Sequence, residues 1–274
     1  MRNDIVSISE SKDLIIFLDA VLYRNFCLKL ELGVEIEFYL HDCDDIEKFK
    51  AIYEDKIISE RGKNQYEINL DKTSNLITAC NSFYSAKNKL ISAANESNYL
   101  IDFAAKPING DYGSAAHYHL TLLDDNSVNI FGIDGNSHFM ESIIASLLEL
   151  TNPSLYLLTA ASASDFERFI PNFMAPINLS WGGNNRTTLI RIPDCSKKYK
   201  RIEFRLPSST APIEYIIIFL LIAVMEGLKC EKTPPNKIYG NAADGQYKLT
   251  PLLANLIEAK KHFRFMEIIA NYTS

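Results

Sequence analysis

Apolar and polar residues alternate along Leu28–Leu40, where the apolar side chains take every even position and mostly charged ones take the odd positions. Successive side chains of a strand point to opposite faces, so this pattern predicts a strand with one buried and one polar face. Three shorter segments repeat the pattern: Gln65–Leu70, His117–Leu122 and Arg201–Leu206. One-sided strands favour a curved, mainly antiparallel sheet with helices packed on its apolar face.

Five other segments show the 3.6-residue periodicity of helices, which would supply that cover. They are Lys12–Asn25, Leu76–Asn95, Ser137–Leu150, Pro212–Leu228 and Leu249–Ile269. Asn75 and Ser137 are the expected N-terminal caps of the second and third helices. The acidic stretch Asp42–Asp55 is predicted to be a solvated helix or loop. No internal repeat or flexible linker divides the chain, so we expect residues 1–274 to form a single α+β domain.

Composition and charge narrow the class of protein. The chain has 274 residues, of which 47% are hydrophobic and 23% charged, as in ordinary globular domains. A net charge of -6 argues against nucleic acid as a partner. Five cysteines without a Cys-x-x-Cys pair favour a reducing compartment over a disulfide framework or zinc site. The N-terminus lacks the pattern of a signal peptide and Tyr215–Val224 is too short to span a bilayer, so we expect a cytoplasmic protein without a membrane partner.

The polar face of the predicted sheet concentrates acidic and imidazole side chains. Glu35 and Glu37 lie two residues apart on one strand and therefore point to the same side. If the four strands are neighbours, Glu67, His117 and Glu203 converge with them. Clustered carboxylates repel one another unless cations neutralise them. Oxygen ligands with one imidazole suit magnesium or manganese better than zinc, and such ions could bridge the phosphates of ATP.

A purely structural interpretation competes with this one. A single Glu-x-Glu or His-x-His pair is usually a solvated strand edge, and surface arginines usually form salt bridges. The joint occurrence of such pairs on four one-sided strands favours a site. Arg186 and Arg191 flank an apolar stretch, and Arg205 lies two residues after Glu203 on the same strand face. Guanidinium groups suit carboxylates and phosphates, as a site for ATP and an acid would require.

These motifs resemble those of the glutamine synthetase family. The matching stretches, in chain order, are Glu35–Phe38, Glu60–Leu70, Lys106–His119 and Asn152–Arg205. The first is similar to the family's Glu-x-Glu-Phe strand and the third to its Lys-Pro … His-x-His signature. In the second stretch, the seven-residue spacing from Glu60 to Glu67 is closest to that of the γ-glutamylpolyamine synthetase branch. The resemblance covers about Lys12–Lys229 and implies the fold of the family's catalytic domain.

The resemblance also implies a role for individual residues. The implied ligands of a metal near the glutamate are Glu37, Glu60 and Glu67, and those of a metal on the ATP phosphates are Glu35, His117 and Glu203. Gly113 and Arg168 would bind the glutamate. Arg186 and Arg205 would stabilise the transferring phosphoryl group, with Arg191 beside them. The implied nucleotide contacts are His119, Thr121, Lys198 and Arg201.

The implied reaction is an ATP- and magnesium-dependent ligation of glutamate to an amine through a γ-glutamyl phosphate. Met174 stands where glutamine synthetases proper carry a glutamate that deprotonates ammonium, and a thioether is no base, so we expect a primary amine as the acceptor. Glutamine synthetase activity with ammonia is one alternative. A catalytically inactive binding or regulatory relative is another, favoured by the short Leu40–Ser59 connection and by the lack of the family's N-terminal β-domain. The partner protein is left undecided by the sequence: the chain could form a homo-oligomer or associate with a full-length homologue.

Overall fold

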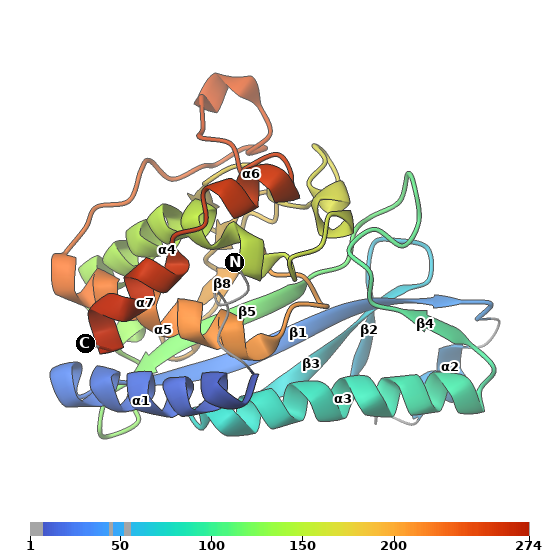
Figure 1. Cartoon of the computed structure of the whole chain (residues 1–274), viewed down its shortest axis with the longest axis horizontal. Coiled ribbons are helices and arrows are strands. Elements are labelled where there is room, and N and C mark those ends of the chain that lie inside the picture. The colour runs from blue at the N-terminus through green and yellow to red at the C-terminus, as the bar shows by residue number, and fades with distance from the viewer. Residues whose placement is uncertain (1–7, 44–45, 52–55, 274) are drawn as a thin grey trace.

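Eight strands form one sheet in the computed structural model, which describes residues 8–43, 46–51 and 56–273. The strand order is β2-β3-β1-β5-β8-β7-β6, and β4 pairs with the end of β1 beyond β5 (Figure 1). The bounds are Lys29–His41 for β1, Ile57–Ser59 for β2, Gln65–Thr73 for β3, Leu100–Asp102 for β4, Ala116–Leu123 for β5, Trp181–Gly182 for β6, Ile190–Arg191 for β7 and Ile202–Phe204 for β8. Among the strands of the described residues, only β6 and β7 pair in parallel. The predicted α+β fold with a mainly antiparallel sheet is confirmed.

The four segments predicted as one-sided strands are β1, β3, β5 and β8, and they are neighbours in the sheet. In the β1–β3 register Glu37 lies opposite Glu67, and in the β1–β5 register Glu35 lies opposite His117. His119 of β5 lies opposite Glu203 of β8. The adjacency on which the predicted site depends is therefore present.

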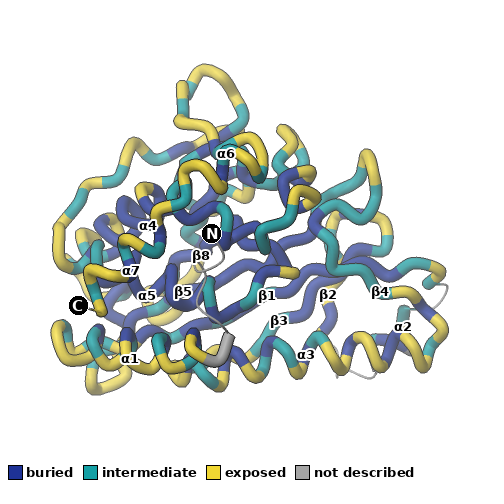
Figure 2. Tube along the Cα trace, viewed as in Figure 1, coloured by how far each residue is buried: buried dark blue, intermediate teal, exposed yellow. Residues whose placement is uncertain are grey.

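Helices cover the apolar face of the sheet. The longer ones are α1 (Ile8–Phe26), α3 (Leu76–Glu96), α4 (Ser137–Leu158) and α5 (Ile213–Cys230). Alternate residues of β1, from Leu30 to Phe38, are at most 3% exposed and pack into the common core, which Figure 2 shows as buried strands behind partly exposed helices. α4 and α5 approach closely at Gly227, where a Cβ atom would lie 2.6 Å from Cα of Ile143.

The C-terminal third departs from the prediction of one helix over Leu249–Ile269. Two short helices replace it, α6 (Leu256–Lys261) and α7 (Phe265–Thr273). Residues 249–252 instead run beside another segment, because Leu252 N–H donates to Ile177 and Pro251 pairs with Asn178 in an isolated bridge. Between α6 and α7 the N–H of Arg264 donates to the carbonyl of Pro153 in α4.

The remaining short elements complete the chain. They are α2 (Ile46–Ala51), η1 (Ile130–Gly132), η2 (Ser164–Arg168), η3 (Lys197–Tyr199) and η4 (Gly245–Tyr247). α2 falls in the predicted acidic stretch, of which residues 44–45 and 52–55 lie outside the described residues. Asn75 caps α3 as predicted, since its side chain accepts from Thr78 N–H. Ser137 is not a cap: it is the first residue of α4, after Asn136. Within the described part of the chain, no helix is long and apolar enough to cross a membrane.

Candidate active site

Three buried or half-buried side chains on the polar face of the sheet form a group suited to a metal ion. Glu35 on β1, Glu67 on β3 and His117 on β5 present ligand atoms that all lie within 4.8 Å of one another. Glu37 joins the group at its edge, where its Oε1 is 3.8 Å from His117 Nε2. Its other oxygen accepts the N–H of Ala115 at 2.8 Å, so strand pairing and this hydrogen bond fix its position.

The charges of this group are unfavourable without a cation. Burial raises the pKa of Glu67 to about 9, and the neighbouring carboxylates of Glu35, Glu60 and Glu37 add to the rise. Burial also raises the pKa of Glu37. A carboxyl that resists ionisation among other carboxylates becomes a good ligand when a divalent cation replaces the missing counter-charge. The oxygen-rich donor set with one imidazole therefore fits magnesium or manganese.

Glu35 also contacts His119, which lies two residues after His117 on the same face of β5. Its Oε1 lies 2.7 Å from His119 Nε2, and its Oε2 lies 3.4 Å from His117 Nδ1. Arg201 Nε donates to His119 Nδ1 at 3.0 Å, and because a guanidinium only donates, that ring nitrogen is unprotonated. Burial would raise the pKa of Glu35, but the contacts with the two imidazoles outweigh burial and lower it.

Glu203 has different neighbours from the other acidic residues. Its Oε1 accepts from Arg205 Nη1 at 2.5 Å and its Oε2 from Arg191 Nη1 at 2.6 Å. Burial opposes ionisation, but these guanidiniums, with His117 and His119, lower the pKa of Glu203 to about 2. A metal ion at Glu203 would thus share its carboxylate with two arginines.

A small cavity of about 30 Å³ lies beside the acidic group. Its lining includes the predicted residues Glu37, Glu60, Gly113, His117, Arg168, Arg186 and Arg205, together with Met174. Gly113 is tightly enclosed, since a Cβ atom there would lie 2.7 Å from Ala105 O and from Arg168 Cβ. The buried Arg168 donates to the carbonyls of Arg205 and Leu206, and burial lowers its pKa to about 10.

A second pocket of about 280 Å³ lies on the other side of Glu35. Three predicted nucleotide contacts, His119, Thr121 and Arg201, line it. The fourth, Lys198, does not: it is exposed on η3 and its Nζ lies 5.6 Å from the centre of the Tyr199 ring. Eleven of the fifteen predicted site residues line these two cavities. Glu67 lies beside Glu35 and His117, and Glu203 pairs with Arg205. Lys198 lies outside both cavities, and Arg191 reaches the site through Glu203.

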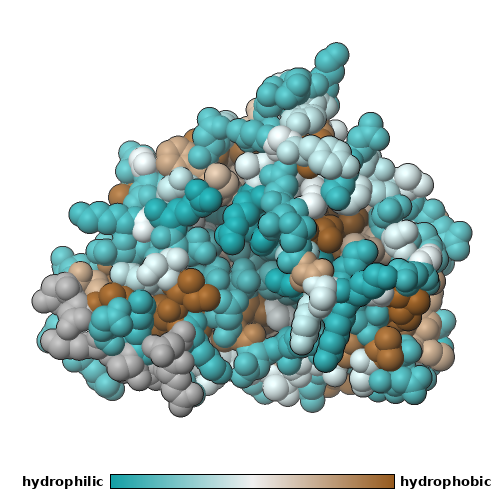
Figure 3. All heavy atoms as spheres, turned by 180° about the vertical axis from the view of Figure 1, so that it is seen from behind, coloured by the Kyte–Doolittle hydropathy of each residue, from teal (hydrophilic) through white to brown (hydrophobic). Residues whose placement is uncertain are grey.

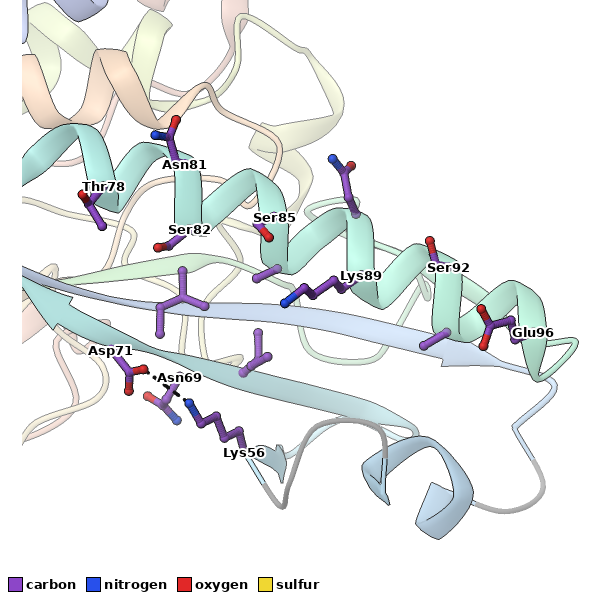
Figure 4. A pocket seen from close by; sticks show the side chains of 15 residues that line it. Lys56, Asn69, Asp71, Thr78, Asn81, Ser82, Ser85, Lys89, Ser92 and Glu96 are labelled. Atoms are coloured by element: carbon purple, nitrogen blue, oxygen red, sulfur yellow. Dashed lines mark hydrogen bonds and ion pairs between the residues drawn. The ribbon is translucent and has the colours of Figure 1, made fainter.

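A larger hollow lies elsewhere. It is a groove of about 1080 Å³ between α3 and the outer edge of β3 (Figure 4). Serine, asparagine and lysine side chains line it, and Lys56 Nζ lies 3.3 Å from Asp71 Oδ2 across its floor. It holds none of the predicted site residues, so size alone does not locate the chemistry.

Hydrophilic residues predominate on the face seen from behind in Figure 3.

Several residues of the smaller cavity were not among the predicted site residues. They are Arg61, Gln65, Tyr112, Phe173 and Ala175. Gln65 is structural as well, since its side chain donates to Gly113 O and accepts from Gly62 N–H. Tyr112 and Phe173 meet edge-on with ring centres 5.6 Å apart. Each of the five is at most two residues from a predicted or discussed position, so proximity to a motif was the available signal.

Comparison with known proteins identifies relatives of this chain. A family model described as the glutamine synthetase catalytic domain matches residues 43–273. The γ-glutamylputrescine synthetase PuuA of Escherichia coli K12 is 28% identical over 207 residues, 75% of this chain and 44% of that protein. A glutamine synthetase of Thermococcus kodakarensis is 32% identical over 189 residues, 66% of this chain and 41% of that protein. The chain therefore spans less than half the length of these curated relatives.

Solved structures resemble the fold over nearly the whole chain. The structure of apo GmaS without ligand superposes with a TM-score of 0.81 at 21% identity, and covers 96% of this chain and 69% of that one. A complex of GmaS with ADP gives a TM-score of 0.80 at the same identity. At this identity the likeness concerns the fold.

Proposed function

Because the chain belongs to the glutamine synthetase family, we propose that it is a ligase that uses ATP and magnesium to join the γ-carboxylate of a glutamate-like acid to a primary amine. One observation supports this most: two carboxylates and an imidazole (Glu37, Glu60 and His117) line the same cavity as a cluster of arginines. ATP would phosphorylate the γ-carboxylate, and the amine would then displace phosphate. Activation is needed because an ionised carboxylate is a poor electrophile.

The acidic half of the site would hold the divalent ions. Glu35, Glu67 and His117 are the first candidates as ligands, with Glu37 and Glu60 beside them. When bound, such ions would neutralise charge on the phosphates and orient the transferring group. The pocket lined by His119, Thr121 and Arg201 adjoins Glu35, which would place the nucleotide on that side.

The cationic half would receive the acid and the phosphoryl group. Arg186 and Arg205 line the small cavity, so their guanidiniums can stabilise oxygens that gain negative charge during transfer. Arg168 would bind the α-carboxylate beside Gly113. The cavity, at about 30 Å³, is small for a glutamate-like acid, so we expect part of its lining to move when the acid binds.

The acceptor side of the cavity is apolar and aromatic. Tyr112, Phe173, Met174 and Ala175 form this part of the lining. Position 174 offers a thioether and not a carboxylate, so it cannot take a proton from ammonium. Apolar contact with the carbon chain of an alkylamine would instead supply binding free energy. We therefore favour a primary amine over ammonia. The name of the E. coli relative, γ-glutamylputrescine synthetase, also refers to a primary amine.

Turnover by the purified protein tests this proposal. The protein is incubated with glutamate, magnesium and ATP, and ADP release is followed with ammonium, methylamine or putrescine as acceptor. Release that depends on an alkylamine supports the ligase. Release with ammonium alone would support glutamine synthetase activity. Binding of magnesium and ATP without turnover would support an inactive relative, for example one that acts with a longer homologue.

The metal assignment has a separate test. Glu67→Gln keeps the shape of the side chain but removes its charge, and Glu96→Gln is the matched control because Glu96 is exposed in the distant groove of Figure 4. We expect Glu67→Gln to weaken magnesium or manganese binding at least about tenfold, and Glu96→Gln to leave it unchanged. Equal affinities in titration calorimetry would remove Glu67 from the metal site.

A further inference from the structure

We propose that Asn241 is a positioning residue that holds the turn of residues 172–175 over the candidate active site. The proposal concerns a segment far along the chain from the motifs, residues 235–243, which follows α5. Its kinetic consequence rests on the proposed ligase function, whereas its structural consequence does not. The argument starts from the turn itself, which contributes Phe173, Met174 and Ala175 to the lining of the small cavity.

The turn has a backbone conformation that its own residues do not favour. Asn172 and Met174 have φ angles of +71° and +59°, in the left-handed region. Asparagine tolerates this region, but for methionine it is unfavourable and persists only when the surroundings hold it. Something outside the turn must therefore fix it.

Contacts on the inner side of the turn account for part of this restraint. The carbonyl of Met174 accepts a hydrogen bond from Arg205 Nη2 at 3.3 Å. The ring of Phe173 meets Tyr112 edge-on, and Lys106 Nζ lies 4.4 Å from the centre of the Phe173 ring. The conformation of the turn thus sets where an arginine of the site lies.

Asn241 supplies the restraint on the outer side. Its Nδ2 donates to Asn172 Oδ1 at 2.9 Å. Its own Oδ1 accepts from Ala243 N–H at 3.0 Å, which orients the amide so that Nδ2 points to Asn172. Ala242 is anchored on both sides, since its N–H donates to Thr187 Oγ1 at 2.9 Å and its carbonyl accepts from Asn178 Nδ2 at 2.6 Å.

The same segment also supports the loop that carries Arg186. Asn185 Nδ2 donates to Gly240 O at 2.8 Å, and Thr187 Oγ1 donates to Asn185 Oδ1 at 2.7 Å. Residues 240–242 therefore bond to the loop that presents Arg186 and to the turn that presents Met174. Because both line the small cavity, the segment determines how far apart two of its walls lie. The bond to the loop of Arg186 comes from Ala242, which is buried. The bond to the turn comes from the exposed pair Asn172–Asn241.

Hydrogen exchange in the absence of ligands tests the restraint without any need for activity. Asn241→Ala removes the donor, and Asn172→Gly removes the acceptor while suiting the positive φ. We expect either variant to speed exchange of the amides of residues 173–175 by about two- to tenfold, the range of an exposed hydrogen bond. The double variant should exchange no faster than the faster single one, because both remove the same bond. Asn236→Ala, at an exposed position of the same segment, is the control.

A conservative variant separates a specific bond from general loosening. Asn172→Asp keeps an oxygen that can accept from Asn241 and tolerates the left-handed region, so its exchange should stay close to that of the wild type. In turnover assays, Asn241→Ala should lower kcat by about two- to tenfold, because a single exposed hydrogen bond is lost. The KM for ATP should be unchanged, since the nucleotide pocket lies on the other side of Glu35.

The outcomes distinguish this proposal from the proposed function. Exchange at residues 173–175 that is the same in Asn241→Ala and wild type would overturn the positioning role, and so would additive effects in the double variant. Loss of protection in Asn172→Asp equal to that in Asn172→Gly would also overturn it. If no variant turns over any amine, the ligase fails, but the exchange result still decides the role of Asn241.

Discussion

Lys87 is a half-buried cation whose removal should stabilise the protein at neutral pH. It lies on α3, and its Nζ is 4.5 Å and 5.5 Å from the ring centres of Phe103 and Phe83. It donates to the carbonyl of Ser209 at 2.8 Å, and no carboxylate of the described residues forms an ion pair with it. Burial lowers the pKa of Lys87 from 10.5 to about 8.

This lowered pKa fixes the sign and window of a pH effect. Between pH 8 and 10.5 the unfolded lysine binds more protons than the folded one, so the wild-type free energy of unfolding rises with pH there. Below pH 8 the full cost is present, about 3 kcal/mol at about 1.4 kcal/mol per pKa unit. Lys87→Met removes that cost but leaves the Ser209 carbonyl without its donor, a loss of about 1–2 kcal/mol. We expect a net gain of about 1 kcal/mol at pH 7, and a net loss near pH 10.5.

Urea denaturation of wild type and Lys87→Met at several pH values between 7 and 10.5 measures this difference. Lys89→Met is the matched control, because Lys89 is an exposed residue of the same helix. Other groups titrate in this range, but they cancel in the comparison between variant and wild type. A difference in unfolding free energy that stays constant with pH would refute the account of Lys87, whatever its size.

Three further predictions concern packing, a buried hydrogen bond and the acceptor. Gly227→Ala should destabilise the protein by about 1–3 kcal/mol in urea denaturation, because the new Cβ would lie 2.6 Å from Cα of Ile143; unchanged stability would contradict this packing. Tyr84→Phe should cost about 2–3 kcal/mol, since it removes the 2.7 Å hydrogen bond to the fully buried carboxylate of Glu214; a thermal midpoint equal to that of the wild type would contradict it. Met174→Glu should raise ammonium-dependent ADP release relative to that with methylamine, and an unchanged ratio would show that position 174 does not select the acceptor.

The strands were predictable because each has one apolar and one polar face. Period-two alternation fixes which side chains share a face, so Glu203 and Arg205 were expected together, and they lie 2.5 Å apart. Arg191 reaches Glu203 from β7, a strand of two residues, and no periodicity can reveal so short a strand. The pairing of Glu203 with two guanidiniums therefore came only from the structure.

The errors lie where tertiary contacts outweigh local pattern. The apolar spacing of Leu249–Ile269 fits a helix, but Leu252 N–H bonds to Ile177, far along the chain, and the helix begins only after Asn255. In the same way, Phe173 and Tyr112 enter the cavity because a strained turn and a loop meet there. Such positions have no sequence period, so only the family motifs beside them indicated where to look.

The site has an acidic half, which favours a cationic ligand, and a cationic half, which favours an anionic ligand. On one side Glu37 and Glu67 are carboxyls whose pKa burial raises, so ionisation there requires a cation. On the other side Arg186 and Arg205 line the cavity. The buried guanidinium of Arg205 pairs with Glu203, and Arg186 is exposed. A metal ion bound to phosphate oxygens would bring both charges, a cation for the acidic half and an anion for the cationic half. This division of charge is consistent with the proposed phosphoryl transfer, because a metal ion alone would serve only the acidic half and a carboxylic acid alone only the cationic half.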